Sequence, residues 1–208
     1  MKKKTLVFDM GNVLITFDTH AILAGRGLDR EEIDIFTETV FRSPEWREYD
    51  RGTVEKSAFL RPIGLLPPKL AALAKDMILD HVFGEVYMPP FPATQELVRR
   101  AKLAGYPLYL LSNAGQDFYV YKKKIPALDS FDGLFISSDW KLLKPDREIY
   151  LAFLEKFSLC AQDCLFIDDM QVNIDGAKAV GMDGVCFNAA RDPIEKLYSD
   201  LAEKGIVI

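Results

Sequence analysis

The segment at residues 5–14, TLVFDMGNVL, constrains the fold more than any other. Residues 5–8 are β-forming and show no helical periodicity, which predicts a buried strand of a parallel sheet. Asp9 follows at the end of this strand, and Gly11 and Asn12 suit a tight turn. Ligands bind at this edge of open α/β sheets, and a buried carboxylate needs a cation or hydrogen-bond donors. Asp9 is therefore either a turn-capping residue or part of a ligand site.

The composition allows one sizeable hydrophobic core, with or without a small additional domain. The chain has 208 residues, of which 49% are hydrophobic, and its formal net charge is −5. No basic run is longer than the lysines at residues 2–4 and 122–124. A nucleic-acid partner is therefore not expected.

The sequence pattern shows neither a signal peptide nor a membrane span. Asp9 interrupts the first apolar run too early for a signal peptide, and no stretch approaches the roughly 18–20 apolar residues of a span. Cys160, Cys164 and Cys186 are odd in number and lie beside or within apolar runs, which favours reduced structural cysteines. We therefore expect a cytoplasmic protein without membrane partners, either a monomer or a homodimer.

The hydrophobic pattern divides the chain into a core and an insertion. Between residues 18 and 85, apolar residues recur only at helical spacing. The proline-rich residues 88–92 form a rigid connector that ends this region. We predict a Rossmann-like catalytic core formed by residues 1–16 and 88–208, and a small helical cap formed by residues 17–87. Prolines are expected to break the cap into separate helices at Ser43–Pro44, Arg61–Pro62 and Pro67–Pro68.

From Ala93 onward, helices are expected to alternate with strands. The predicted strands after the first are 108–111, 134–137, 164–167 and 184–187. The predicted helices are 94–103, 117–123, 146–157, 172–180 and a last helix in which Asp192 is the cap and Pro193 the first residue. This alternation predicts an α/β fold with a three-layer, right-handed parallel sheet.

Polar residues follow three of these strands and precede one helix. They are Asp9, Ser112, Asn113, Lys144, Asp168 and Asp169. Since the ends of parallel strands meet at one edge, these groups should converge on one cleft. Crowded carboxylates need a cation, and oxygen ligands of this kind suit Mg²⁺. The lysine, the hydroxyl and turn amides supply what a phosphoryl group needs, and a carboxylate facing the phosphorus can attack it.

Taken in order, these residues resemble the four motifs of the haloacid dehalogenase superfamily. The resemblance covers essentially the whole chain, including a helical cap after the first strand. The segments FDMGNVL, YDRGTVEKSAF, LLSN, KPDREIY and FIDDMQVNIDGAKAVG are most similar to bacterial α-glucose-1-phosphate phosphatases. The phosphatase domain of soluble epoxide hydrolases is also similar.

The resemblance implies that Asp9 is a nucleophile that accepts the phosphoryl group. Lys144 would neutralise developing charge and restrain Asp9, and Asn113 would support the phosphate or contact the leaving group. Catalysis would rest on positioning and electrostatic stabilisation. The implied phosphate-binding residues are Met10, Gly11, Ser112, Asn113 and Lys144.

The resemblance also implies a Mg²⁺ site. Asp9, the backbone carbonyl of Gly11 and Asp169 would be its ligands, and Asn173 lies where the last residue of the fourth motif falls. Asp168 would be a supporting catalytic residue, or a ligand through water. Mg²⁺ would act as a template and a charge clamp.

Gly11 departs from the superfamily pattern, which places an Asp there as general acid and base. We expect a loss of roughly 10²–10⁴-fold on poor leaving groups. Asp18 or His20 is a candidate replacement as proton carrier, and the alternative is that Asp18 caps the first cap helix while His20 lies on its surface. The similar phosphatase group also lacks this Asp, so the gap does not imply inactivity.

Two further interpretations stay open. Metal-independent 2-haloacid dehalogenases also lack this acid, but their fourth motif resembles Ser–Ser–Asn, whereas Asp168 and Asp169 are retained here. A non-catalytic module that binds phosphate or a metabolite is the second interpretation, because fold does not guarantee function. The favoured function is a Mg²⁺-dependent phosphatase acting on a small phosphorylated metabolite, with a sugar phosphate as the expected example. Trp46 and Tyr49 in the cap are candidate substrate contacts, or packing residues between cap helices.

Overall fold

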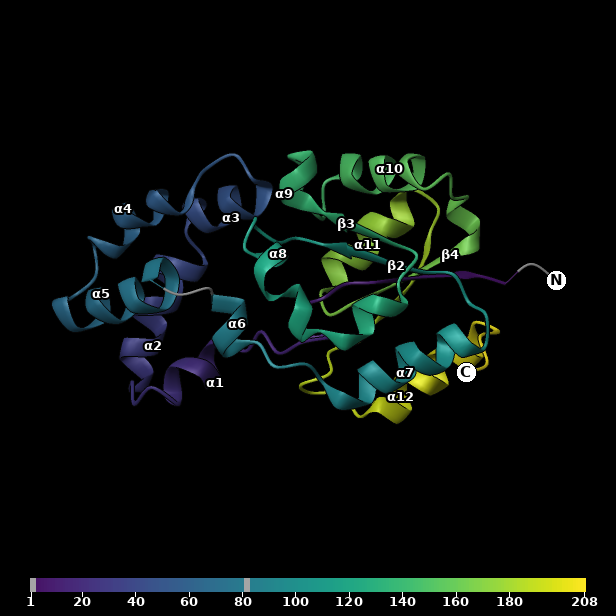
Figure 1. Ribbon diagram of the computed structural model, residues 1–208, viewed down its shortest axis with the longest axis horizontal. Helices are drawn as coiled ribbons and strands as arrows, with labels where there is room; N and C mark the ends of the chain where they lie inside the picture. The colour runs from purple at the N-terminus through teal and green to yellow at the C-terminus, as the bar shows by residue number, and fades with distance from the viewer. Residues whose placement is uncertain (1–2, 81–82) are drawn as a thin grey trace.

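Five parallel strands form one sheet (Figure 1). The computed structural model describes residues 3–80 and 83–208. The strands are β1 (Thr5–Phe8), β2 (Leu108–Ser112), β3 (Gly133–Ile136), β4 (Cys164–Asp168) and β5 (Asp183–Cys186). Their spatial order is β3-β2-β1-β4-β5, and every neighbouring pair is parallel. The predicted α/β fold with a Rossmann-like parallel sheet is therefore confirmed.

Helices cover both faces of this sheet. They are α7 (Pro92–Leu103), α8 (Phe118–Tyr121), α9 (Ser137–Trp140), α10 (Arg147–Lys156), α11 (Gln171–Ala179) and α12 (Ile194–Glu203). α7 and α12 lie together on one face, and α10 lies on the other (Figure 1). Alternate strand residues face opposite sides, so Leu6 and Phe8 pack with α7 and α12, whereas Val7 packs with α10 and α11. Among the helices that the structure describes, none combines the length and apolar character needed to cross a membrane.

The structure shifts some predicted boundaries by about one residue. Strand β3 ends before Ser137, because this residue begins α9, a short helix that the sequence did not predict. The last helix begins at Ile194 rather than at Pro193. Its predicted cap, Asp192, instead accepts a hydrogen bond from the N–H of Asn188 at 2.9 Å. The loop before α12 therefore uses this carboxylate for its own turn.

A block of helices joins β1 to β2, and we call it the helical insertion (residues 19–87). Its helices are α1 (Thr19–Ala24), α2 (Arg30–Phe36), α3 (Pro44–Arg51), α4 (Leu60–Ile63), α5 (Pro68–Ala74) and α6 (Phe83–Tyr87), with π-helical turns at Thr37–Phe41 and Lys75–Asp80 and a 3₁₀ turn at Lys56–Phe59. Residues 19–80 and 83–87 contain no strand. Their apolar side chains form a cluster of their own, in which Phe36, Val40 and Met77 are fully buried. The break predicted at Pro62 is wrong, because this residue lies inside α4.

Local sequence signals begin two of these helices. Asp29 and Glu32 form a capping box at α2, in which each side chain accepts a hydrogen bond from the backbone N–H of the other, at 2.9 and 3.1 Å. At α3, Ser43 Oγ accepts from the N–H of Trp46 at 3.1 Å, and Pro44 is the first helical residue. The helix that carries the partly buried Trp46 thus begins where the sequence predicts a break.

The end of α3 packs tightly against α9, beside it in Figure 1. Gly52, just after α3, has a φ of 76°, and a Cβ atom placed on it would lie 2.3 Å from the carbonyl oxygen of Ser138. The hydroxyl of Ser137 donates to the carbonyl of Asp50 at 2.6 Å. A close backbone approach of this kind requires glycine. The helical insertion is therefore fixed to the sheet region next to the ends of β2 and β3.

Replacing Gly52 by Ala is expected to destabilise the protein more than replacing Gly27 by Ala. Both residues have a positive φ, 76° and 78°, so each alanine costs about 1–2 kcal/mol in the left-handed region. In the described chain, nothing lies within 4 Å of a Cβ atom on Gly27, whereas the methyl group at Gly52 would collide with Ser138. This collision should add about 1–3 kcal/mol, measured by urea unfolding. Equal losses in the two variants would contradict the close packing of α3 against α9.

Candidate active site

Asp9 lies directly beyond β1, at the carboxyl edge of the sheet. Its backbone N–H donates to the carbonyl of Ile167 in β4 at 2.8 Å, which continues the pairing of the two strands. The chain then turns back, since the N–H of Leu14 donates to the carbonyl of Met10 at 2.8 Å. Asn12 in this turn has a φ of 52°, a conformation that asparagine tolerates better than most residues. The tight turn predicted after Asp9 is present.

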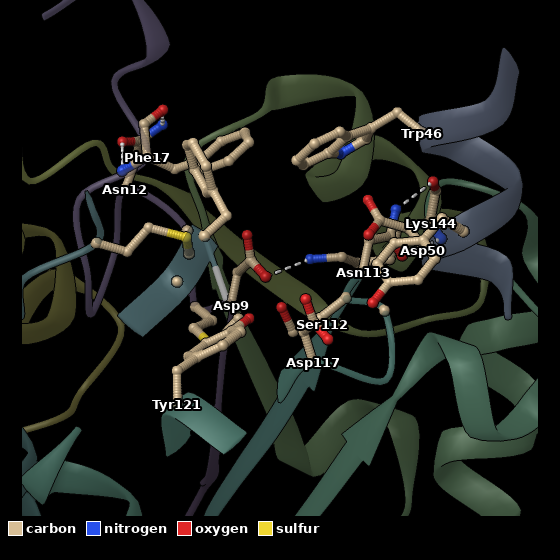
Figure 2. Close-up of a pocket in the computed structure, with 18 of the residues that line it drawn as sticks. Asp9, Asn12, Phe17, Trp46, Asp50, Ser112, Asn113, Asp117, Tyr121 and Lys144 are labelled. Atoms are coloured by element: carbon tan, nitrogen blue, oxygen red, sulfur yellow. Dashed lines mark hydrogen bonds and ion pairs between the residues drawn. The ribbon is translucent and has the colours of Figure 1, made fainter. Parts of the chain in front are cut away.

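Lys144 is buried between two carboxylates. Its Nζ lies 2.7 Å from an oxygen of Asp9 and 2.7 Å from an oxygen of Asp168. A dashed line in Figure 2 marks the ion pair with Asp9. The side chain of Asn113 holds the backbone of Lys144 on both sides. Its Nδ2 donates to the Lys144 carbonyl at 3.0 Å, and its Oδ1 accepts from the Lys144 N–H at 2.9 Å. One ammonium and one amide therefore connect the ends of β1, β2 and β4.

Asp168 is fully buried and supports Lys144 from below the pocket. Its Oδ1 accepts from the N–H of Met170 at 2.8 Å and from Nδ2 of Asn173 at 2.9 Å. Met170 lies in the loop after β4, and Asn173 lies in α11. The carboxylate is thus held in place by neutral donors and one cation, which suits a residue that positions Lys144.

Asp169 differs from its neighbour because it is partly exposed and lines the pocket. Its Oδ2 accepts from Nδ2 of Asn12 at 3.1 Å and from Nδ2 of Asn188 at 3.2 Å. Asn12 comes from the turn after β1, and Asn188 follows β5. Two amides from different loops therefore orient the carboxylate that the resemblance assigns to the metal.

The charges of this site are not balanced by its own residues. Burial raises the pKa of Asp9; the ammonium of Lys144 acts in the opposite direction, and the carboxylates of Asp168 and Asp169 raise it further. Burial also raises the pKa of Asp169. Although burial opposes its charge, Lys144 has a raised pKa because Asp168 and Asp9 stabilise the ammonium. Three carboxylates and one ammonium together carry a net negative charge, which a bound cation would offset.

The oxygen atoms present fit a hard divalent cation. Asp9, Asp168 and Asp169 each offer one oxygen, and these oxygens lie within 4.8 Å of one another. Gly11, whose carbonyl is the predicted third ligand, lines the same pocket. Carboxylate and carbonyl oxygens are ligands that Mg²⁺ prefers, and Mg²⁺ keeps several waters when two carboxylates hold it. The donor set is therefore compatible with the predicted ion.

Asp9 and Asp169 line a pocket of about 300 Å³ between the sheet edge and the helical insertion (Figure 2). Ser112 and Asn113, from the end of β2, line it together with Asp9, and Ser112 is almost completely buried. Lys56 and Asp117 form an ion pair in its wall at 2.7 Å. The remaining wall is mainly apolar and includes Phe17, Trp46, Phe59, Ile78, Phe83 and Met88. A leaving group in this pocket would contact hydrocarbon and aromatic surface on several sides.

The candidate substrate residues fall into two groups. Trp46 and Tyr49 line the pocket, and both also pack against Phe59 in the helical insertion. Asp18 and His20 do not line it. The carboxylate of Asp18 accepts from the N–H of Ala21 at 3.0 Å and so caps α1, and His20 is exposed on that helix. The structure therefore offers no geometric support for either of these two as the proton carrier.

Two features of the site were not predicted from the sequence. Asp50 lines the pocket, and Asn188 donates a hydrogen bond to Asp169. Asp50 lines the pocket from α3, four residues after Trp46 and next to Tyr49. Residues at i, i+3 and i+4 share one face of a helix, so the spacing of these three residues is the available signal. Asn188 lies in a loop after β5, and its sequence context carries no comparable signal.

Comparison with known proteins identifies the same family. The family model for haloacid dehalogenase-like hydrolases matches residues 3–181. The sesquiterpene phosphatase astK of Aspergillus oryzae is 29% identical over 187 residues, which are 88% of each chain. The phosphatase MT3486 of Mycobacterium tuberculosis is 26% identical over 227 aligned positions, covering 100% of this chain and 98% of that protein. Of several other curated relatives, the chain spans only about two fifths of the length.

A solved structure agrees with this fold. The haloacid dehalogenase family enzyme bt-2542 of Bacteroides thetaiotaomicron, in complex with magnesium and inorganic phosphate, aligns with a TM-score of 0.61 at 22% identity. The alignment covers 92% of this chain and 97% of that one. With the parallel sheet, the buried Lys144 between Asp9 and Asp168, and the family match over most of its length, the chain belongs to the haloacid dehalogenase-like hydrolases.

Proposed function

We propose that the protein is a Mg²⁺-dependent phosphatase that acts on a small phosphomonoester through an aspartyl-phosphate on Asp9. The observation that carries this proposal is the ammonium of Lys144, 2.7 Å from both Asp9 and Asp168, at the base of a pocket that Asp169 also lines. One oxygen of Asp9 is held by Lys144, which leaves the other for attack. The phosphatase names of relatives that match most or all of the chain support the same function.

The chemistry proceeds in two steps. An oxygen of Asp9 attacks the phosphorus, the bond from phosphorus to the leaving oxygen breaks, and the phosphoryl group is left on Asp9. Water then attacks the phosphorus and releases inorganic phosphate, which restores the carboxylate. Lys144 holds Asp9 in line and neutralises charge on the phosphoryl oxygens, and the hydroxyl of Ser112 and the turn amides of Met10 and Gly11 donate to these oxygens.

Asp9, Asp169 and the Gly11 carbonyl would hold Mg²⁺. When bound, this ion supplies positive charge against the phosphoryl oxygens. Asn12 and Asn188 orient Asp169 for this role, at 3.1 and 3.2 Å. The unbalanced charges of Asp9, Asp168 and Asp169 give a physical reason for the ion.

A metal-independent dehalogenase is less well supported, because it would leave Asp169 and Asp9 close together without a cation. A binding module without turnover is the other alternative. It conflicts with the retention of Asp9, Lys144 and Ser112 around a pocket that is open to a ligand. Both alternatives are separated from a phosphatase by measuring phosphate release.

The substrate is proposed to be a small phosphorylated metabolite. A sugar phosphate remains one candidate from the sequence resemblance. The apolar wall formed by Trp46, Phe59 and Phe83 favours a second candidate, a phosphate ester of a hydrocarbon or aromatic alcohol. The name of the fungal relative, a sesquiterpene phosphatase, points to the same class. A panel with glucose 1-phosphate, farnesyl phosphate, benzyl phosphate and 4-nitrophenyl phosphate compares the two candidates.

Asp9→Asn is expected to abolish phosphate release from every member of this panel, because the amide oxygen is a poor nucleophile. Wild-type and variant proteins are compared by a phosphate assay, and far-ultraviolet circular dichroism checks that both are folded. Asp175→Asn, an exposed change on α11, serves as the control with unchanged turnover. Turnover in Asp9→Asn equal to that of the wild type would exclude the covalent mechanism.

Lys144→Met is expected to lower the free energy of unfolding by about 3–5 kcal/mol, because it leaves Asp9 and Asp168 buried without their cation. Adding Asp168→Asn should recover part of this loss. Lys69→Met, which removes a largely exposed partner of Glu32, should cost no more than about 1 kcal/mol. Chemical denaturation measures all three variants, and a Lys144 cost as small as the Lys69 cost would refute the buried charge pair.

Mg²⁺ removal by EDTA is expected to abolish turnover, and added Mg²⁺ should restore it. Because a ligand that binds only the folded state stabilises it, millimolar Mg²⁺ should also raise the thermal midpoint of the wild type. The same addition should leave the midpoint of Asp169→Asn nearly unchanged. Full activity in EDTA, with no shift of the midpoint, would contradict the metal assignment.

A further inference from the structure

Gly11 has no side chain that could carry a proton, so another group must protonate the leaving oxygen. A carboxyl group beside the pocket that is neither the nucleophile nor a metal ligand is the most direct replacement for an Asp that acts as general acid. Four carboxylates line the pocket, namely those of Asp9, Asp50, Asp117 and Asp169. Asp9 and Asp169 have other roles, and Asp117 is paired with Lys56 at 2.7 Å. Only Asp50 is left among the described residues that line it.

We propose that Asp50 is the general acid and base of the phosphatase reaction, supplied by α3 of the helical insertion. This inference rests on the proposed function of Asp9. In the first step, the Asp50 carboxyl group gives its proton to the leaving oxygen as the bond to phosphorus breaks. In the second step, the Asp50 carboxylate takes a proton from the water whose oxygen attacks the phosphorus. Each turnover thus returns Asp50 to its protonated form.

The backbone around Asp50 is fixed to the sheet region by contacts from several sides. The Ser137 hydroxyl donates to the Asp50 carbonyl at 2.6 Å and accepts from the N–H of Ala114 at 2.9 Å. Arg51 lies 3.8 Å from the carboxylate of Asp146. The carbonyl of Gly52 accepts from Nζ of Lys141. These contacts hold the backbone of residues 50–52 against the sheet region, although it belongs to the insertion.

Asp50, Trp46 and Asn113 all line the pocket, and their side chains are among those drawn in Figure 2. The nearby Gly115 amide and Trp46 indole each lower the pKa of the Asp50 carboxyl group. Asp50 also lines a second cavity that runs between α3 and the loop before α10, past Arg47 and Pro145. A carboxyl group at the junction of two cavities can exchange its proton with solvent while a substrate fills the first.

The electrostatic surroundings of Asp50 suit a group that must hold and release a proton near neutral pH. Burial raises the pKa of Asp50 to about 7, although the Gly115 amide and the Trp46 indole oppose this, and the nearby carboxylate of Asp9 contributes to the increase. No cation of the described chain forms an ion pair with Asp50 that would cancel the effect. General acids work best when their pKa lies near the working pH.

The test compares two leaving groups in the wild type and in Asp50→Asn. The leaving group of benzyl phosphate is a strongly basic alkoxide unless its oxygen is protonated. The leaving group of 4-nitrophenyl phosphate is a weakly basic phenolate, which departs without a proton. We expect Asp50→Asn to lower kcat/KM for benzyl phosphate by about 10²–10⁴-fold and for 4-nitrophenyl phosphate by less than about tenfold. Because the general base is also lost, 4-nitrophenol should appear as a burst, with phosphoenzyme accumulating. Asp50→Glu should restore part of the benzyl phosphate activity.

The controls separate this proposal from the proposed function. Asp18→Asn, at the other candidate carboxylate, should leave both substrates unchanged. Equal losses on the two substrates in Asp50→Asn would show that Asp50 only positions the pocket, and would overturn the proposal. A wild type without Asp9-dependent hydrolysis of either substrate would overturn the proposed function, and the role of Asp50 with it.

A second variant keeps the test valid if Asp50→Asn does not fold. Ser137→Ala removes the hydroxyl that donates to the Asp50 carbonyl at 2.6 Å and leaves the carboxyl group intact. It should lower benzyl phosphate turnover more than 4-nitrophenyl phosphate turnover, because only benzyl phosphate needs the proton that Asp50 supplies, whereas the loss of the contact with the Ala114 N–H acts on both substrates alike. An unchanged ratio of the two activities would argue against Asp50 as the acid.

Discussion

The site depends on one buried ammonium. Lys144 Nζ lies 2.7 Å from both Asp9 and Asp168, and both its side chain and that of Asp168 are almost completely removed from solvent. A buried charge is tolerated only when it is paired and hydrogen-bonded, so the loop before α10 must place Lys144 where β1 and β4 end. Asn113 fixes that loop through two hydrogen bonds. The positions of Asp9, Asn113 and Lys144 relative to one another follow from this arrangement.

The sheet and the helical insertion supply different groups to the site. The strand ends supply carboxylates, an ammonium and hydroxyl or amide donors, which are the groups needed to move a phosphoryl group. The insertion supplies the aromatic wall and Asp50, which would decide what leaves and how its oxygen is protonated. The close approach of Gly52 to Ser138 fixes α3 against α9. Trp46 and Asp50 both belong to α3, so the same helix would contact the leaving group and protonate it.

The sequence predicted the convergence at the sheet edge and the helical character of the insertion, but it did not predict that Asp50 lines the pocket, for a physical reason. Asp9, Ser112 and Asp168 lie at strand ends, and the parallel topology alone brings strand ends together. The contribution of Asp50 depends on how α3 docks onto α9, a tertiary contact that no local pattern encodes. Asn188 is similar, since it meets Asp169 only after β5 has joined the sheet. Capping residues marked the starts of α2 and α3 correctly. The expected cap Asp192 failed as a signal, because its carboxylate accepts a hydrogen bond within the preceding loop instead.

Transfer of the phosphoryl group to Asp9 is the step on which the proposed function depends. The most direct measurement is peptide mass spectrometry of the wild-type protein, quenched in acid within milliseconds of mixing with 4-nitrophenyl phosphate and Mg²⁺. We expect the peptide containing Asp9 to gain the mass of one phosphoryl group, and this species to decay as phosphate is released. Release of phosphate without any modification of this peptide would contradict this transfer.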